Sequence, residues 1–199
     1  TVDECIEKGI DSIIVISAGF KESGIDGAAR ERELYQKIKQ HSIRMLGPNC
    51  LGLIDTQSAL NASFAADMPA PGNIAFFSQS GALCTSILDW AANECIGFSK
   101  FISMGNKTDI DEVALIKAIE NDAGTKIVLV YLEGVKNGTE FINAAKEITK
   151  KKPMIVVKSG GTTAGTKRAV ISNPGHINIA RLRVYGPGPA THNINESPG

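Results

Sequence analysis

Short apolar runs alternate along this chain of 199 residues with longer segments whose apolar residues recur every three or four positions. The apolar runs predict strands at residues 13–16, 43–46, 73–77, 100–104, 127–132 and 154–157. The longer segments predict helices at residues 2–8, 25–40, 81–94, 109–121 and 138–149. Strands joined by single helices imply right-handed crossovers, so we predict an α/β protein whose parallel sheet is covered on both faces.

Within this pattern, single segments carry more detailed expectations. The continuous β-branched run 13–16 predicts a fully buried strand. In the last two helices, one apolar stripe is predicted to face the core. Its members are Val113, Ile116 and Ile119 in one helix and Phe141, Ala145 and Ile148 in the other.

Gly and Pro interrupt the alternation at residues 47–52, and the following twenty residues have no clear period. We therefore predict a domain boundary here, with one domain ending at residue 52 and a second one starting at residue 53. The chain begins without Met and enters helical sequence directly, so it is expected to be a piece of a longer protein.

The composition excludes several classes of function. Lys and Arg number 21, as do Asp and Glu, so no global field attracts nucleic acid or an acidic membrane surface. No apolar run is long enough to cross a bilayer, and the cysteines lack the spacing of metal ligands. Cys84 and Cys95 fall on the apolar side of a predicted helix, which favours buried thiols and a reducing cytoplasm.

Candidate chemistry lies in the loops that follow the predicted strands, because ligands of parallel sheets bind at the carboxyl ends of the strands. Four loops are expected to converge there, at residues 78–82, 105–109, 133–138 and 159–165. In the first, Ser80 and Gly81 open a helix whose free N–H groups could hold a phosphate. Ser is also a common N-cap, so plain capping is the alternative.

Each of the other three loops has a functional and a structural interpretation. Residues 105–109 combine an amide, a cation and a carboxylate, or simply cap a helix at Thr108 or Asp109. Glu133 is a carboxylate delivered to the sheet edge, or a solvated acid. Residues 159–165 form either a mobile phosphate loop or a flexible linker.

Taken in order, these loops resemble the α-subunit of the NDP-forming acyl-CoA synthetases, and most of all that of the ADP-forming acetate–CoA ligases, which are related to succinyl-CoA synthetase. The resemblance spans nearly all of residues 1–169. It is carried by residues 47–52, 78–82, 105–107, 131–134 and 158–169. It implies that residues 1–52 are the C-terminal part of a Rossmann-like CoA-binding domain and that residues 53–169 are a flavodoxin-like ligase domain.

The resemblance also implies a mechanism in which an acyl phosphate forms and its phosphoryl group passes to a histidine. Glu133 matches the acid that orients this histidine. The phosphoryl group would lie against Ser78, Ser80, Gly81 and Ala82. The CoA thiol and the acyl group would lie near Pro48, Asn49, Cys50, Gly105 and Asn106. CoA, ADP or ATP with Mg²⁺, a small carboxylic acid, an ATP-grasp β-subunit or domain, and an oligomeric assembly are implied as well.

The chain departs from the family at two places. The upstream glycine turn that holds the CoA phosphates is absent, so weak CoA binding is expected. After Ala169, where the family has a Ser-His-Thr-Gly-like motif, residues 170–199 form an atypical tail in which His176 is the candidate phosphoryl acceptor. His41 and His192 are expected to be incidental surface residues. We therefore expect an inactive fragment of an acid–thiol ligase. The alternative is a ligand-sensing regulatory domain of a protein acetyltransferase.

Overall fold

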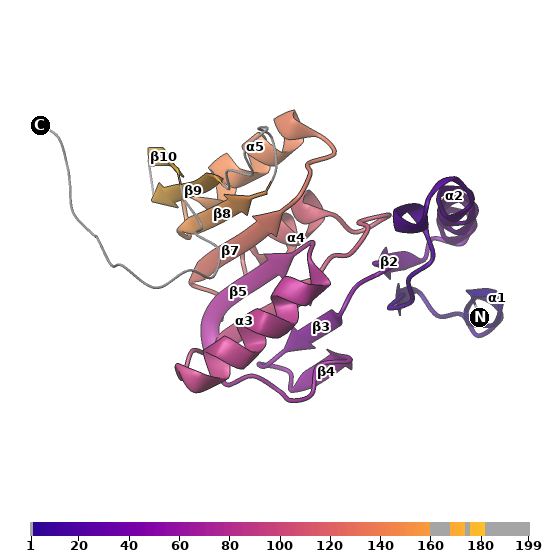
Figure 1. Cartoon of the computed structure of the whole chain (residues 1–199), viewed down its shortest axis with the longest axis horizontal. Helices are drawn as coiled ribbons and strands as arrows, with labels where there is room; N and C mark the ends of the chain where they lie inside the picture. The colour runs from indigo at the N-terminus through magenta and orange to yellow at the C-terminus, as the bar shows by residue number, and fades with distance from the viewer. Residues whose placement is uncertain (1, 160–167, 174–175, 182–199) are drawn as a thin grey trace, which may run out of the picture.

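The computed structural model describes residues 2–159, 168–173 and 176–181, with side-chain positions for 2–159. Its N-terminal part is a small unit in which strands β1 and β2 pair in parallel and helix α2 connects them (Figure 1). The elements of this unit are α1 (Val2–Glu7), β1 (Ser12–Ile14), the 3-10 turn η1 (Lys21–Ser23), α2 (Ile25–Gln40) and β2 (Arg44–Leu46). This is a βαβ unit, and its assignment to a Rossmann-like domain stays a prediction.

The larger part is an eight-stranded sheet, as far as the described residues go, with the order β10-β9-β8-β7-β5-β6-β3-β4. The inner strands β8, β7, β5 and β6 run in parallel, whereas both flanks pair antiparallel. The strands are β3 (Gly52–Asp55), β4 (Leu60–Ser63), β5 (Pro71–Ser78), β6 (Phe98–Ser103), β7 (Ile127–Leu132), β8 (Met154–Lys158), β9 (Arg168–Asn173) and β10 (His176–Arg181). The parallel centre confirms the predicted α/β class.

Helices cover both faces of the parallel strands, and neighbouring side chains of β5 show the two faces clearly. Phe76 packs with helix α3 (Gly81–Asn93), whereas Phe77 packs with helices α4 (Glu112–Ile119) and α5 (Gly138–Ile148) on the other side (Figure 1). Burial on both faces explains why β7 is apolar throughout. The predicted inward stripes are confirmed, since Val113, Ile116, Ile119 and Ile148 are buried and Phe141 and Ala145 pack against the core.

The register brings the carboxyl ends of the parallel strands to one edge. Ser78 of β5 lies opposite Ser103 of β6 and Tyr131 of β7, and Leu132 of β7 lies opposite Lys158 of β8. The loops that follow these strands therefore start side by side, as the sequence predicts. Residues 160–165 of the fourth loop lie outside the described residues.

Several local expectations are wrong. The run 13–16 is not a buried strand: β1 is short, its side chains are exposed or half-buried, and it pairs only with β2 among the described residues. Strands β3 and β4 form a hairpin in a stretch where the sequence shows no period, and β3 joins the main sheet beside β6. In the tail, β9 and β10 form an antiparallel hairpin that extends the sheet beyond β8.

Cys95 is a further correction. Helix α3 ends at Asn93, and Cys95 follows its C-cap with a left-handed φ of 55° and an exposed side chain. Cys84 is buried as predicted, and burial raises the pKa of its thiol to about 11. Only one of the two cysteines therefore faces the helix-covered core.

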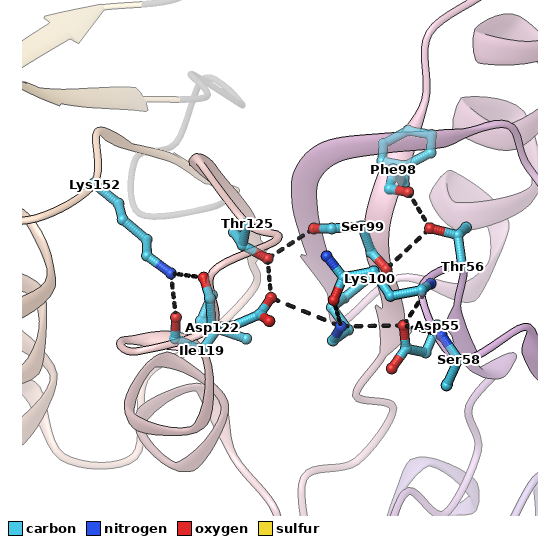
Figure 2. Close-up of polar contacts among 11 residues, drawn as sticks. Asp55, Thr56, Ser58, Phe98, Ser99, Lys100, Ile119, Asp122, Thr125 and Lys152 are labelled. Atoms are coloured by element: carbon cyan, nitrogen blue, oxygen red, sulfur yellow. Dashed lines mark hydrogen bonds and ion pairs between the residues drawn. The ribbon is translucent and has the colours of Figure 1, made fainter.

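A polar network joins the segments at the edge of the sheet opposite the loops 78–82, 105–109 and 133–138 (Figure 2). Lys100 of β6 lies between two carboxylates, with its Nζ 3.0 Å from Asp55 and 3.7 Å from Asp122. Thr125 donates to Asp122 (2.6 Å) and shares a hydrogen bond with Ser99 (2.7 Å). These contacts tie β3, β6 and the loop after α4 together.

Helix α4 ends against a buried lysine. Lys152 donates through Nζ to the carbonyl oxygens of Ile119 (2.6 Å) and Asp122 (2.5 Å), and it is 8% exposed (Figure 2). A cation at a helix C-terminus satisfies carbonyl groups that have no partner within the helix and interacts favourably with the helix dipole.

The described residues contain no helix that is both long and apolar enough to span a membrane.

The different surroundings of the cysteines predict different thiol reactivity. At pH 8, a disulfide reagent should modify Cys95 in the native chain, because its thiol is exposed. Cys84 should react only after unfolding, because it is fully buried and its pKa is raised to about 11. Peptide mapping by mass spectrometry after a short exposure distinguishes the two. Rapid modification of Cys84 in the native chain, or modification of Cys84 before Cys95, would contradict this assignment.

Candidate functional site

A cavity of about 410 Å³ lies at the carboxyl edge of the parallel strands. Loops that follow β5, β6 and β7 form one side of it, and the N-terminal unit forms the other. Its lining residues are Lys21, Glu22, Asn49, Gln79, Gly105, Asn106, Lys107, Glu133, Gly134, Val135 and Lys136. Of the residues predicted from the sequence, Asn49, Gly105, Asn106 and Glu133 thus share one cavity.

The two sides of the cavity are joined through their backbones. The N–H of Asn106 donates to the carbonyl of Pro48 (2.8 Å), and the N–H of Thr108 donates to that of Gly47 (3.1 Å). Gly105 permits this approach: its φ is 56°, and a Cβ there would lie 2.2 Å from the Pro48 carbonyl oxygen. Two backbone hydrogen bonds therefore hold the loop 105–108 against the loop 47–49.

Asn106 is the centre of the polar contacts between the two sides. Its Nδ2 donates to Glu22 (2.6 Å) and to Glu31 (2.8 Å), and its Oδ1 accepts from the Asn49 amide (3.3 Å). The carbonyl oxygen of Asn106 accepts from Lys21 Nζ. Both amide hydrogens of Asn106 are thus used within the protein, so its side chain shapes the cavity more than it can donate to a ligand.

The two carboxylates on Asn106 are held in their charged form. Desolvation acts to raise the pKa of Glu22, but hydrogen bonds from Asn106 and from the N–H groups of Phe20 and Gly19 outweigh it and lower the pKa to about 2. Desolvation likewise opposes ionisation of Glu31, whose pKa is nevertheless lowered by hydrogen bonds from Thr108, Asn106 and the Lys21 backbone. Both acids are therefore anions at neutral pH.

Thr108 and Asp109 do not cap a helix, contrary to the structural alternative for this loop. Asp111 is the N-cap of α4, and its side chain accepts from the N–H of Ala114 (3.0 Å). Thr108 donates to Glu31 (2.5 Å), and Asp109 accepts from Arg44 and from the N–H of Met45, both at 2.9 Å. The side chains of Thr108 and Asp109 are thus directed to the N-terminal unit.

The start of α3 differs from expectation in one respect. Ser80 is a true N-cap, since its Oγ accepts from the N–H of Leu83 (3.3 Å), but its own N–H is not free because it donates to Ser78 Oγ (3.0 Å). Among the described residues, the N–H groups of Gly81 and Ala82 have no acceptor. An anion at this helix would therefore be held by Gly81 and Ala82, with Ser78 and Ser80 shaping the turn.

Cys50 and Pro48 stand behind the cavity wall. Cys50 is 3% exposed, its Sγ donates to the carbonyl of Val15 (3.4 Å), and burial raises the pKa of its thiol to about 11. A neutral, buried thiol cannot serve as a nucleophile at neutral pH. Pro48 contributes its carbonyl group to the docking of the loop 105–108.

The structure does not bring His176 and Glu133 together. His176 pairs with Asn173 in the β9–β10 hairpin, beside Ile177, which lies level with Met154 at the start of β8. Glu133 directly follows β7 at the opposite edge. Strand rise and spacing place the two backbones roughly 20 Å apart or more. His41 is an exposed C-cap of α2, as expected of an incidental residue, and His192 lies outside the described residues.

Sequence reasoning missed Lys21 and Glu22 of the cavity lining, and it did not single out Gln79 and Lys136 within the predicted loops 78–82 and 133–138. Lys21 and Glu22 follow β1 as the first loop of the βαβ unit, so the rule that sites lie after parallel strands could have found them. Burial, and then the nearby Lys21 ammonium, lower the pKa of Lys136. No group of three or more metal-ligating side chains occurs among the described residues.

Comparisons with known proteins agree with this architecture. Residues 71–177 match the family described as succinyl-CoA ligase like flavodoxin domain. The ADP-forming acetate–CoA ligase I of Archaeoglobus fulgidus is 44% identical over 168 residues, which cover 84% of this chain and 24% of that protein. The α-subunit of the Pyrococcus furiosus ADP-forming acetate–CoA ligase II is 42% identical over 177 residues, covering 89% and 38%.

A solved structure shows the same fold. The dinucleotide forming acetyl-coenzyme A synthetase 1 of Ca. Korarchaeum cryptofilum, in complex with phosphate and ADP, superposes with a TM-score of 0.78 at 38% identity, covering 82% of this chain and 35% of that one. The chain belongs to the succinyl-CoA-ligase-like flavodoxin family, which confirms the resemblance to the α-subunits and domains of NDP-forming acyl-CoA synthetases. It spans between about a quarter and two fifths of the length of the curated relatives named here.

The close approach at Gly105 predicts a large effect of a single methyl group. Gly105→Ala should lower the free energy of unfolding by about 2 kcal/mol or more, because alanine is strained at this φ and its Cβ meets the Pro48 carbonyl. Gly134→Ala is the matched control, since a Cβ there has no atom within 4 Å, and it should change stability by only about 0.5 kcal/mol. Urea denaturation of the three proteins measures both; equal stabilities would disprove the close docking.

Glu22 should titrate in an unusual range. In the unfolded chain its pKa is near 4.5, and in the folded chain it is lowered to about 2. Its contribution to stability is therefore complete above pH 4.5 and is lost as the pH falls toward 2. A carboxyl NMR titration should show the low value in the native chain and a higher one in Asn106→Ala. Asn143→Ala, on the exposed surface of α5, should leave it low; an unchanged value in Asn106→Ala would contradict the contact.

Proposed function

We propose that this chain supplies the acyl-transfer site of an ADP-forming acyl-CoA ligase, which interconverts acyl-CoA, ADP and phosphate with a carboxylic acid, CoA and ATP. A small acid such as acetate is the favoured substrate, since acetate–CoA ligases are prominent among its relatives. The observation that carries the proposal is the cavity in which Glu133 faces the docked loops at Asn49 and Gly105, at the carboxyl edge of a family-typical sheet.

In the first step, phosphate attacks the thioester carbonyl of acyl-CoA, the C–S bond breaks, and CoA leaves as the thiolate, so that an acyl phosphate forms. Lys21 and Lys136 line the cavity and would stabilise the negative charge on phosphate and on the leaving thiolate. The N–H groups of Gly81 and Ala82 would hold the phosphoryl group nearby, with Ser78 and Ser80 fixing the turn. Asn49, Gly105 and Asn106 line the cavity and would border the thiol and acyl group of CoA, with Pro48 and Cys50 supporting them from behind.

In the second step, a histidine nitrogen attacks the phosphorus of the acyl phosphate and the carboxylate leaves. Glu133 would accept a hydrogen bond from the other ring nitrogen, which fixes the tautomer and leaves the attacking nitrogen unprotonated. Among the described residues, the Glu133 carboxylate has no hydrogen-bond partner and is exposed, so it is available for this role. The phosphohistidine then meets ADP.

We propose that ADP and Mg²⁺ are bound by an ATP-grasp subunit or domain, to which the phosphohistidine moves, and that the complete ligase is an oligomer in the cytoplasm. The α-subunit named among the relatives supports a partner subunit. We propose that the acceptor is a histidine other than His176, and the distance between the β9–β10 hairpin and Glu133 supports this. The chain as it stands is therefore expected to be inactive.

Phosphoryl transfer to the chain tests the proposal. The native chain, incubated with an ATP-grasp partner and labelled ATP, should show no acid-labile phosphohistidine, because no histidine of the described residues lies near Glu133. A chain whose sequence after Ala169 is replaced by a family-like Ser-His-Thr-Gly continuation should become labelled. Adding Glu133→Ala should then reduce labelling by about a hundredfold, as expected for a misplaced nucleophile.

The outcomes separate clearly. Failure of the replaced chain to become labelled with a partner that labels its own α-subunit would overturn the proposed function. Labelling of the native chain that is abolished by His176→Ala would show that the tail itself carries the acceptor. Glu140→Ala, a substitution in the first turn of α5 outside the cavity lining, is the control for Glu133→Ala and should leave labelling unchanged.

A further inference from the structure

The backbone of Glu133 and Gly134 is held by side chains of other segments. The N–H groups of both residues donate to Gln79 Oε1, at 2.5 Å and 3.0 Å. The carbonyl of Glu133 accepts from Lys158 Nζ (2.7 Å), and the carbonyl of Gly134 accepts from Lys107 Nζ (2.7 Å). All four backbone polar groups of this dipeptide are thus bonded to side chains from loops or strand ends other than its own.

Two of these side chains lie at the ends of the strands that flank β7, namely β5 and β8, and the third comes from the loop after β6, the strand on the far side of β5. Gln79 follows β5, Lys107 follows β6, and Lys158 ends β8. Gln79 is itself fixed, because its N–H donates to the carbonyl of Tyr131 (3.1 Å). The position of Glu133 therefore depends on the relative position of the whole row of parallel strands rather than on a local turn.

Lys107 is the most deeply buried of the three. It is 4% exposed and pairs with Glu112 at 2.7 Å, which is 1% exposed and begins α4. A buried ion pair is stable only when its remaining donors and acceptors are satisfied, and removing one partner leaves the other charge unpaired. The Gly134 carbonyl is one of the acceptors that satisfy Lys107, so the loop and the ion pair fix each other.

We propose that Gln79, Lys107 and Lys158 are positioning residues that hold the loop 133–134 so that the Glu133 carboxylate faces the cavity. The proposal rests on the proposed function, in which Glu133 orients the phosphorylated histidine. A displacement of a catalytic group by an ångström can cost about a hundredfold in rate. Fixing four backbone groups by side chains leaves the Glu133 carboxylate uncommitted while its Cα is immobilised.

Amide hydrogen exchange of the chain tests the positioning without any activity. The double variant Lys107→Met/Glu112→Leu removes both charges together, which avoids an unpaired buried carboxylate and preserves the packing of the pair. Exchange at Glu133 and Gly134 should become about tenfold faster or more, because the Gly134 carbonyl loses its Lys107 donor and only Gln79 and Lys158 still hold the loop. The amides of Val128 and Val130 in the centre of β7 should keep their protection.

Lys152→Met is the matched control. Lys152 is also a buried lysine that donates to two carbonyl groups, but it lies at the opposite edge of the sheet. Its loss should leave exchange at Glu133 and Gly134 unchanged.

Gln79 offers a second comparison. Gln79→Ala should accelerate exchange at both amides, whereas Gln79→Glu, which retains an acceptor oxygen, should keep exchange slow.

Activity then links the loop to catalysis. In the chain with the family-like histidine continuation, incubated with the ATP-grasp partner, Lys107→Met/Glu112→Leu should lower kcat for phosphohistidine formation by about tenfold to a hundredfold with little change in KM for ATP, since only the orientation of Glu133 is altered. Unchanged exchange at Glu133 and Gly134, or faster exchange with an unchanged kcat, would overturn the inference. If no protein is labelled at all, the proposed function fails, whereas the exchange result still decides whether the loop is held as described.

Discussion

The backbone contact between the loops 47–49 and 105–108 is the constraint on which the site depends. It joins the small N-terminal unit to the parallel sheet through the carbonyl groups of Gly47 and Pro48, and it requires a residue without Cβ at position 105. Once the two loops are docked, Asn106 lies between Glu22 and Glu31, and the cavity forms beside it. A wider separation would remove the Asn106 amide as a donor to both carboxylates.

Charges are used differently at the two edges of the sheet. At the edge away from the cavity, Asp55, Lys100 and Asp122 satisfy one another, and Lys152 satisfies the end of α4 (Figure 2). At the cavity edge, the buried Lys107–Glu112 pair has the same structural character. However, this pair contacts the loop 133–134, in which the Glu133 carboxylate is exposed. The paired charges thus stabilise the fold, whereas the Glu133 carboxylate is exposed and unpaired among the described residues.

The family relation and the site geometry support each other but answer different questions. Similarity over residues 71–177 defines the ligase-type flavodoxin domain, and it explains the parallel strands with loops at their carboxyl ends. The geometry adds that Ser80 donates its own N–H to Ser78 and that Asn106 has committed its amide hydrogens. The N–H groups of Gly81 and Ala82 therefore remain without an acceptor among the described residues, whereas Lys21 is paired with Glu31 (3.3 Å) and Lys136 donates to the carbonyl of Thr108 (3.2 Å).

The sequence by itself determined the order and type of most elements, because burial on both faces makes a strand such as Ile127–Leu132 apolar throughout. It also placed Glu133 and the loop 105–109 at the same edge, since parallel strands deliver their loops together. Only the tertiary structure decided that Asp111 rather than Thr108 caps α4, because Thr108 is engaged by Glu31, which lies 77 residues away in the chain. The hairpin β3–β4 and the contributions of Lys21 and Gln79 were likewise set by partners distant in sequence, which no local pattern of hydrophobicity records.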